Sequence, residues 1–147
     1  MKLKWAILIL TACVLPAAAA RAQSWETNFE RAASRARVQK KHMLLDFSGS
    51  DWCGWCHKLD REVFQHPAFK NYARDNLVCV VLDFPRNKKQ SRILERQNQE
   101  LAQKYGVRGY PTVIILDPAG NLVGKTGYRP GGAEAYVEHL RSMIGAP

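Results

Sequence analysis

Apolar side chains recur every three or four positions along four stretches of the chain, with charged residues between them. In the first stretch the series begins at Trp25 and continues to Ala36. This spacing places the apolar side chains on one face of a helix. Gly106 directly follows the third stretch, as a glycine that ends a helix commonly does. The pattern therefore predicts helices over residues 25–40, 56–72 with a break or restart at Pro67, 93–105, and 132–144.

Shorter apolar runs lie between these helices and predict strands over residues 43–47, 77–82, 112–116 and 122–125. The second run is almost wholly apolar and β-branched, which is typical of a strand covered on both faces. A turn from Asp117 to Gly120 separates the last two runs, so we expect them to form an antiparallel hairpin. Strands that are separated by helices should run parallel. The order αβαβαββα predicts an α/β fold, in which a mixed central sheet has helices on both faces.

The first 22 residues have the layout of a secretory signal peptide. Lys2 and Lys4 precede an apolar run and then an alanine-rich stretch. The run is too short to span a bilayer comfortably. Small residues stand at the two positions that a signal peptidase recognises, which predicts cleavage before Gln23. We therefore expect a signal peptide over residues 1–22 and one domain over residues 23–147.

A second interpretation of the N-terminus stays open. Leu10-Thr11-Ala12-Cys13 resembles the lipobox of bacterial lipoproteins, in which the cysteine is acylated and becomes the new N-terminus. Either route exports the domain, so we expect a periplasmic or secreted bacterial protein, lipid-anchored if Cys13 is acylated. We expect no membrane insertion once the signal is cleaved.

The chain has 147 residues and a formal net charge of +9, which falls to +6 when Lys2, Lys4 and Arg21 leave with the signal peptide. The remaining chain, of about 125 residues, suits one domain with a core of its own. Basic residues are scattered over the first predicted helix and the loop at residues 86–89, without aromatic residues that would stack on bases. We interpret them as solvated faces and expect no nucleic-acid binding. We expect the mature chain to be a monomer.

The sequence Cys53-Gly54-Trp55-Cys56 lies where a predicted strand and turn lead into a helix. Its spacing places two sulfurs within bonding reach across the first helical turn. Unpaired N–H groups and the positive end of the helix dipole favour the thiolate over the thiol at that position. Cys53 is therefore the expected attacking thiolate. Cys56 lies one turn deeper, so we expect it to be more shielded and to resolve the mixed disulfide.

Three other interpretations of this pair stay open. A structural disulfide would close a loop too small to restrict the unfolded chain much. A zinc site needs two further ligands, and no second closely spaced pair is present. Residues 53–57 also satisfy the C-x-x-C-H pattern of c-type haem attachment, although here the motif follows a predicted strand. In the dithiol interpretation, His57 either tunes the two sulfurs or is a solvated side chain.

Three segments together resemble the thioredoxin family. They are residues 45–47 (Leu-Asp-Phe), 51–56 (Asp-Trp-Cys-Gly-Trp-Cys) and 105–112 (Tyr-Gly-Val-Arg-Gly-Tyr-Pro-Thr). The resemblance extends over nearly all of residues 40–145. Within the family, the chain is most similar to exported thioredoxin-like domains, including the C-terminal domain of the electron-transfer protein DsbD. Two separated motifs in the expected order make this resemblance more specific than a lone C-x-x-C.

The resemblance implies a thioredoxin-like fold with a cis Pro111 beside the Cys53/Cys56 pair. The backbone of Tyr110 would then pair with an extended substrate segment, because a cis proline holds a tight bend that lets a peptide approach closely. Trp52 would pack against the active-site turn, and Trp55 would offer an apolar face to partners. The alternatives are an ordinary trans proline at a strand start and a Trp55 that only covers the helix start.

Some residues depart from the family pattern. Gly-Trp stands between the cysteines in place of the common Gly-Pro, which leaves the redox potential open. Asp46 resembles the buried aspartate that helps the second cysteine lose its proton, but Val81 stands in place of that carboxylate's lysine partner. Asp46 is therefore either a proton relay or a solvated or capped carboxylate at a strand end. Cys79, inside an apolar strand, is expected to be a buried inert thiol.

These observations predict an exported thiol:disulfide oxidoreductase that works by thiol–disulfide exchange through Cys53 and Cys56. Its expected partners are disulfide-containing protein substrates and a membrane electron-donor protein, and the resemblance favours the reductase direction. We expect no metal and no cofactor. Two other classes stay open: a c-type haem electron-transfer protein, and a non-catalytic thioredoxin-fold binding module whose cysteines are vestigial.

Overall fold

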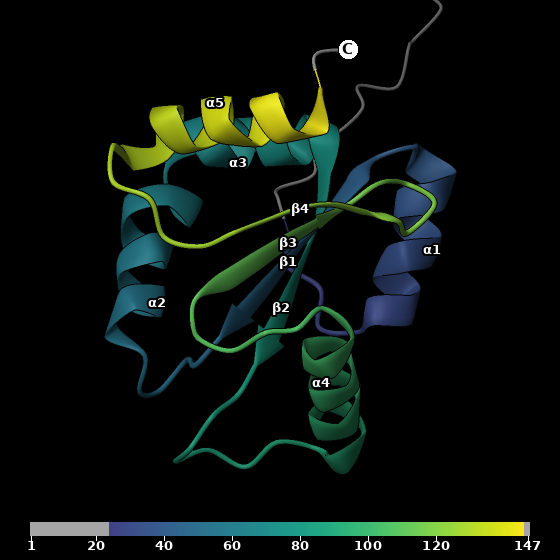
Figure 1. The fold of residues 1–147 in the computed structure, drawn as a ribbon, viewed down its shortest axis with the longest axis vertical. Helices are drawn as coiled ribbons and strands as arrows, with labels where there is room; N and C mark the ends of the chain where they lie inside the picture. Colours follow the sequence, from purple (N-terminus) through teal and green to yellow (C-terminus); the bar gives the residue numbers. More distant parts are fainter. Residues whose placement is uncertain (1–23, 146–147) are drawn as a thin grey trace, which may run out of the picture.

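The computed structural model describes residues 24–145 of the chain (Figure 1). The predicted signal peptide, its cleavage site before Gln23 and the alternative lipidation site at Cys13 lie outside the described residues. Within the described part, no helix combines the length and the apolar character needed to cross a membrane.

Four strands form a mixed sheet in the order β2-β1-β3-β4. They are β1 (His42–Ser48), β2 (Leu77–Asp83), β3 (Thr112–Leu116) and β4 (Leu122–Thr126). As expected, β1 and β2 are parallel, and β3 and β4 form an antiparallel hairpin. However, β3 pairs antiparallel with β1, although a helix separates it from β2. Helical separation along the chain therefore does not by itself fix strand direction.

Helices cover both faces of this sheet, as predicted (Figure 1). Leu44, Cys79 and Ile115 point from the sheet into one core cluster, and Leu45, Val80 and Ile114 point into the other, because alternate residues of a strand face opposite sides. The first cluster lies under α2, η1, α3 and α5, and the second lies under α1 and α4. The helices are α1 (Phe29–Gln39), α2 (Gly54–Leu59), the π-helical turn η1 (Asp60–Phe64), α3 (Pro67–Asn76), α4 (Arg92–Lys104) and α5 (Gly132–Ile144).

The helix predicted from residue 25 begins later than expected, at Phe29. Asn28 caps it, because the Asn28 side chain accepts a hydrogen bond of 2.8 Å from the backbone N–H of Arg31. Glu26 instead extends along β2 and forms an isolated parallel bridge with Val80. Trp25 packs into the cluster opposite to that of Phe29. Its helical spacing from Phe29 was therefore coincidental.

The helix predicted after the strand at residues 77–82 is present, but one of its marker residues is not in the core. Ile93 is 79% exposed, whereas Leu101 and the polar Asn98 are buried. The Asn98 side chain donates a 2.9 Å hydrogen bond to the backbone carbonyl of Asp83, which satisfies the buried amide. Pro67 stands at the start of α3, so the predicted restart at this proline is confirmed.

Candidate active site

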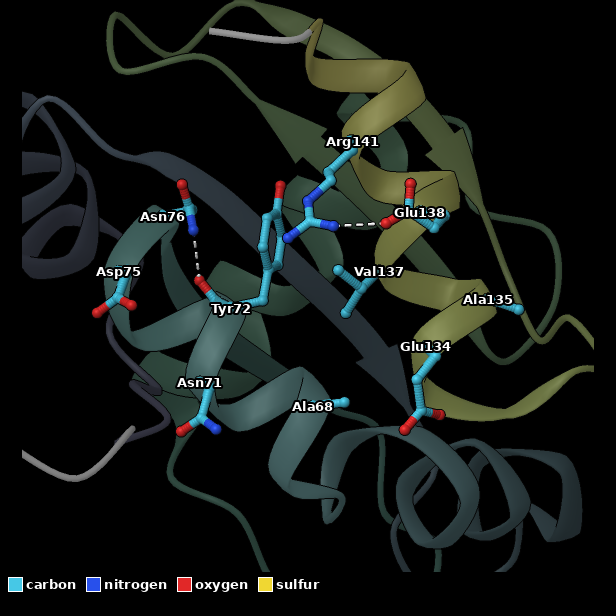
Figure 2. A pocket seen from close by; sticks show the side chains of 10 residues that line it. All are labelled: Ala68, Asn71, Tyr72, Asp75, Asn76, Glu134, Ala135, Val137, Glu138 and Arg141. Carbon is cyan, nitrogen blue, oxygen red and sulfur yellow. Dashed lines mark hydrogen bonds and ion pairs between the residues drawn. The ribbon is translucent and has the colours of Figure 1, made fainter.

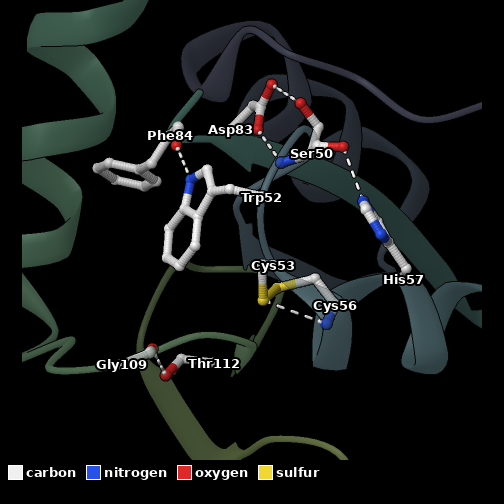
Figure 3. Close-up of a disulfide and its surroundings, with 9 residues drawn as sticks. All are labelled: Ser50, Trp52, Cys53, Cys56, His57, Asp83, Phe84, Gly109 and Thr112. Atoms are coloured by element: carbon white, nitrogen blue, oxygen red, sulfur yellow. Dashed lines mark hydrogen bonds between the residues drawn. A yellow bond between two sulfur atoms is a disulfide. The ribbon is translucent and has the colours of Figure 1, made fainter. Parts of the chain in front are cut away.

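Cys53 and Cys56 form a disulfide at the point where β1 passes through a turn into α2 (Figure 3). Cys53 is the N-cap of α2 in an extended conformation, and its sulfur accepts a 3.2 Å hydrogen bond from the backbone N–H of Cys56. The Cα atoms are 5.3 Å apart. The helix start therefore directs an N–H group at the sulfur of Cys53, as the sequence predicts.

The two cysteines do not differ in overall burial, contrary to expectation. Each is 5% exposed. They differ instead in their surroundings, because Cys56 lines a pocket together with Asp46, whereas Cys53 lies at the helix start beside the Trp52 turn. The neighbouring groups, rather than overall burial, therefore distinguish the two sulfurs.

The turn that precedes Cys53 is held to the end of β2 by several hydrogen bonds. Asp83 accepts from both the backbone N–H and the hydroxyl of Ser50, at 2.8 and 2.5 Å. The indole N–H of Trp52 donates to the carbonyl of Phe84 at 2.8 Å (Figure 3). Gly49 permits this arrangement, since a Cβ there would lie 2.4 Å from the Trp52 ring. The indole hydrogen bond and the missing Cβ at Gly49 thus fix Trp52 against the active-site turn.

Asp51 joins the same turn to the loop after β2. Its two carboxylate oxygens accept hydrogen bonds from the backbone N–H groups of Arg86 and Asn87, at 3.0 and 2.7 Å. These bonds hold the pKa of the half-buried Asp51 carboxyl below its usual value. The guanidinium of Arg86 stacks 3.8 Å above the Trp52 ring. The sequence alone suggested only a solvated basic loop here.

The Tyr110–Pro111 peptide bond is cis. The ring of Tyr110 meets the ring of Trp52 edge-on, with centroids 5.6 Å apart. The hydroxyl of Thr112 donates a 2.7 Å hydrogen bond to the carbonyl of Gly109, which closes this bend beside the disulfide (Figure 3). The motifs at residues 51–56 and 105–112, distant in sequence, therefore meet through Trp52 and Tyr110.

Trp55, between the cysteines, is 58% exposed. Its ring lies 5.2 Å from the ring of Tyr128, and the ammonium of Lys58 lies 5.1 Å from both ring centroids. The hydroxyl of Tyr128 donates a 2.7 Å hydrogen bond to Glu62, which fixes the tyrosine. More than half of Trp55 is therefore accessible to solvent.

Asp46 lies on β1 and is buried, so it is not the solvated strand-end carboxylate that was one of the two alternatives. Burial, followed by the charges of Asp60 and Asp83, raises the pKa of this carboxyl to about 7. Among the described residues, its Oδ1 atom has no hydrogen-bond partner. In the β1–β2 register Asp46 is opposite Val81. Val81 therefore occupies the position that the family resemblance implies for the lysine partner of this carboxylate.

His57 is exposed and lines the pocket that Cys56 and Asp46 share. Its Nε2 atom is 2.8 Å from the carbonyl oxygen of Ser50 (Figure 3). His57 is therefore held against the active-site turn and is not simply solvated. Cys79 is fully buried inside β2 and does not line this pocket, which matches the expected buried thiol.

The sequence interpretation missed three residues of this region: Trp25, Tyr128 and Arg86. Trp25 lines the Asp46 pocket and packs 5.0 Å from the ring of Phe64. All three residues reach the site from segments distant in sequence. Periodicity reports which face of an element is apolar, so it gives no signal for such contacts.

A second groove lies between α3 and α5, away from this chemistry (Figure 2). There the guanidinium of Arg141 lies over the ring of Tyr72, at 5.2 Å from its centroid. The groove shares no lining residue with the pocket beside Cys56. Within residues 24–145, no three His, Cys, Asp or Glu side chains gather as metal ligands.

A family model described as thioredoxin-like matches residues 24–118, which include β1, the cysteine pair and the Tyr110–Pro111 bend. The chain belongs to the thioredoxin-like family. Among the relatives of this thioredoxin-like chain is the disulfide bond reductase DsbH of Chlamydia pneumoniae, 36% identical over 129 residues that cover 88% of this chain and 76% of DsbH. The thiol:disulfide interchange protein DsbD of Vibrio vulnificus is 31% identical over 111 residues, which cover 74% of this chain and 17% of DsbD.

Solved structures give the same assignment. A structure of DsbH oxidoreductase superposes with a TM-score of 0.81 and 32% identity, covering 98% of this chain and 96% of that one. The reduced C-terminal domain of Neisseria meningitidis DsbD has a TM-score of 0.59 at 18% identity, covering 77% and 90% of the two chains, and supports the fold alone. With its bonded Cys53–Cys56 pair, this thioredoxin-like protein is a thiol:disulfide oxidoreductase.

Proposed function

We propose that this protein is an exported disulfide reductase that uses the Cys53/Cys56 dithiol to reduce disulfides in other proteins. The observation that supports the proposal most directly is the hydrogen bond from the Cys56 N–H to the Cys53 sulfur at the start of α2. The same N–H would stabilise a thiolate on Cys53 in the reduced form, because it is already directed at the sulfur. The similarity to a protein named a disulfide bond reductase supports the direction.

In the proposed reaction the Cys53 thiolate attacks one sulfur of the substrate disulfide. A bond forms between Cys53 and that sulfur, and the other substrate sulfur leaves as a thiolate. Cys56 then loses its proton and attacks Cys53, which closes the Cys53–Cys56 bond and releases the second substrate thiolate. Two electrons pass from the protein to the substrate, and the oxidised state of this cycle is the disulfide in the structure.

Asp46 is the proposed acceptor of the Cys56 proton. The two residues line one pocket, and burial keeps the pKa of Asp46 near 7, where the carboxyl can both take up and release a proton. The unpartnered Oδ1 supports this role, since no described group competes for it. In the structure Val81 rather than a cation is opposite Asp46, so charge pairing does not lower this pKa.

The proposed substrate platform consists of Trp52, Tyr110, Pro111 and Trp55. Pro111 has no N–H, and in this proposal the backbone of Tyr110 pairs with an incoming extended segment. Trp55 adds accessible aromatic surface beside the sulfurs. A substrate chain would therefore be held by backbone pairing on one side and by ring contacts on the other.

After each cycle the protein needs a source of two electrons, which we propose is a membrane electron-donor protein. The similarity to DsbD, a thiol:disulfide interchange protein, supports an electron donor that itself reacts by thiol–disulfide exchange. The lysines and the apolar run at the N-terminus support export and a periplasmic or secreted location. We propose that the mature protein acts as a monomer.

The proposed cycle predicts that a Cys56→Ser variant traps the mixed disulfide, because Cys53 can still attack but nothing resolves the product. The reduced variant is mixed with oxidised insulin, quenched with an alkylating reagent and analysed by non-reducing electrophoresis and intact mass. We expect a covalent 1:1 complex, which dithiothreitol separates by reducing the mixed disulfide.

The matched control is Cys53→Ser, which keeps one thiol of the pair but removes the attacking one. We expect at least about tenfold less complex with this variant, since Cys56 is not at the helix start. Equal trapping by both variants, or no trapping by Cys56→Ser while the wild type reduces insulin, would contradict the proposed roles.

A further inference from the structure

Two cations near the disulfide are stacked on the tryptophans of the active-site turn. Arg86 lies on Trp52, at 3.8 Å, and Lys58 lies beside Trp55 and Tyr128, at 5.1 Å from each ring. Trp52 directly precedes Cys53, and Trp55 follows it by two positions. We call the set of Arg86, Trp52, Lys58, Trp55 and Tyr128 the cationic rim. A substrate that approaches Cys53 must pass close to it.

Arg86 is held in place by its own backbone as well as by its side chain. The Arg86 and Asn87 N–H groups bind Asp51, and the neighbouring Phe84 carbonyl binds the Trp52 indole. The loop that presents Arg86 is thus fixed at three points to the turn that presents Cys53. Such prior fixation lowers the entropy that a partner must offset when it binds.

Within the described part of the chain, no carboxylate binds the guanidinium of Arg86. It makes no ion pair or side-chain hydrogen bond there, although stacking on Trp52 orients its plane. The nearby carboxylates are engaged with other groups: Asp51 with the loop backbone, and Asp83 with Ser50. A stacked guanidinium keeps its N–H edge free to bind a carboxylate through two hydrogen bonds.

Lys58 is less available than Arg86. Its ammonium is 4.0 Å from a carboxylate oxygen of Glu62, which also accepts the Tyr128 hydroxyl. Beyond Arg86, the same loop adds Lys88 and Lys89, both exposed, and no acidic residue. The loop thus presents three exposed basic side chains and no acidic one, and Arg86 is the most oriented of the three.

We propose that the cationic rim selects polypeptide substrates that carry aspartate or glutamate beside their disulfide, with Arg86 as the principal specificity residue. This inference rests on the proposed reductase function and names the class of substrate. A carboxylate next to the target cysteine binds the guanidinium edge while the disulfide reaches Cys53. Attraction between opposite charges also speeds the encounter, and salt weakens it.

The test uses three synthetic peptides with one internal disulfide, identical except that two glutamates, two glutamines or two lysines flank one cysteine. The full-length mature protein is first reduced and freed of reductant, so each turnover converts one protein dithiol and one peptide disulfide into a protein disulfide and a peptide dithiol. Quenched-flow alkylation and mass spectrometry give the second-order rate constants. At low salt we expect the glutamate peptide to react about tenfold faster than the lysine peptide.

Two variants distinguish an effect of the cationic rim on the rate ratio from an effect of net charge. Arg86→Gln should reduce the glutamate-to-lysine rate ratio to about twofold. Arg141→Gln removes an equal charge that is also stacked on an aromatic ring, but in the α3–α5 groove, and should leave the ratio at the wild-type value (Figure 2). In 0.5 M NaCl the wild-type ratio should fall toward that of Arg86→Gln.

The outcomes distinguish this inference from the function on which it rests. Equal rates for the three peptides, or an equal loss of selectivity in both variants, would overturn the proposed role of the cationic rim. Neither result would contradict the proposed reductase function. Failure of the reduced wild type to transfer electrons to any of the peptides would count against the reductase function itself. A wild-type preference that Arg86→Gln alone abolishes supports both.

Discussion

At the scale of single residues, the charge of Asp46 links stability to pH. Burial raises the pKa of its carboxyl from 3.8 to about 7, so between these values the folded protein holds a proton that the unfolded chain has released. The contribution of Asp46 to the free energy of unfolding must therefore fall as pH rises from about 4 to 7. The Asp46→Asn variant has no carboxyl at this position, so its free energy of unfolding lacks this fall. We expect the oxidised variant to be more stable than the wild type by on the order of 3 kcal/mol at pH 8 and similar to it at pH 4, measured by urea unfolding.

Asp75→Asn is the matched control for this prediction. Asp75 is exposed, and its hydrogen bond with Arg74 lowers the pKa of the carboxyl. A lowered pKa stabilises the folded state above the unfolded-state value and loses that effect as pH falls, so the control should change stability in the opposite direction. If Asp46→Asn instead gave the same stability difference at pH 4 and pH 8, the carboxyl would not titrate as described.

Residues whose role depends on a local motif could be predicted from the sequence, and those that act through distant contacts could not. The spacing of Cys53 and Cys56 at a strand–helix junction was enough to place the disulfide. The burial of Asp46 was left open, because a carboxylate at a strand end can be covered or solvated depending on what packs over it. Arg86 looked like part of a solvated loop, since nothing in its own segment indicates the Trp52 ring.

At the scale of elements, the segment before α1 closes the pocket under the disulfide. The Glu26 N–H donates to the Cys79 carbonyl and the Val81 N–H donates to the Glu26 carbonyl, both at 2.9 Å. These bonds tie the segment to β2 and place Trp25 against Phe64 and into the pocket that Asp46 lines. Trp25 thus contributes to the burial that raises the pKa of Asp46.

Trp25→Ala should therefore affect both the stability and the titration of Asp46. Loss of ring packing should lower the free energy of unfolding at pH 4 by about 2–4 kcal/mol. Water admitted to the pocket should lower the pKa of Asp46 toward its ordinary value, which flattens the fall in stability between pH 4 and 7. Urea unfolding over that range measures both effects.

Trp55→Ala is the control for size and residue type. Trp55 is 58% exposed and outside the core clusters, so its removal should change the free energy of unfolding by less than about 1 kcal/mol, with the pH dependence unchanged. A Trp25→Ala variant as stable as Trp55→Ala, with the wild-type pH dependence, would show that the segment at residues 24–28 does not seal the pocket.

Secondary structure was the part of the fold that periodicity predicted best, and its errors have physical causes. All four strands and the later helices were placed correctly, because all of them except β4 bury an apolar face or run in the core. β4 is largely exposed, and the turn before it indicated the hairpin. The error at residues 25–28 arose because Trp25 and Phe29 are four residues apart but pack on opposite faces of the sheet. The direction of β3 depends on which strand it joins, and pairing with β1 is a tertiary choice that local pattern does not encode.

At the scale of the whole molecule, the active-site groups gather where the segments after β1 and β2 meet the bend before β3. Cys53 follows β1, Phe84 and Arg86 follow β2, and Pro111 precedes β3. Because β1 is central, with β2 parallel and β3 antiparallel, the ends of the first two strands and the beginning of the third lie at one edge of the sheet (Figure 1). Family membership predicted this convergence, whereas the apolar pattern alone did not.

The fold also bears on how the N-terminus is processed. Trp25 and Glu26 belong to the folded domain through their contacts with Phe64 and β2, so cleavage before Gln23 would leave the whole domain intact. We expect intact-mass analysis of the protein exported from a Gram-negative host to give a chain that begins at Gln23. Cys13→Ser should leave that mass and the yield unchanged, because Cys13 would be removed with the signal. A mature chain that begins at an acylated Cys13, and that Cys13→Ser abolishes, would instead establish the lipoprotein route and a membrane-anchored reductase.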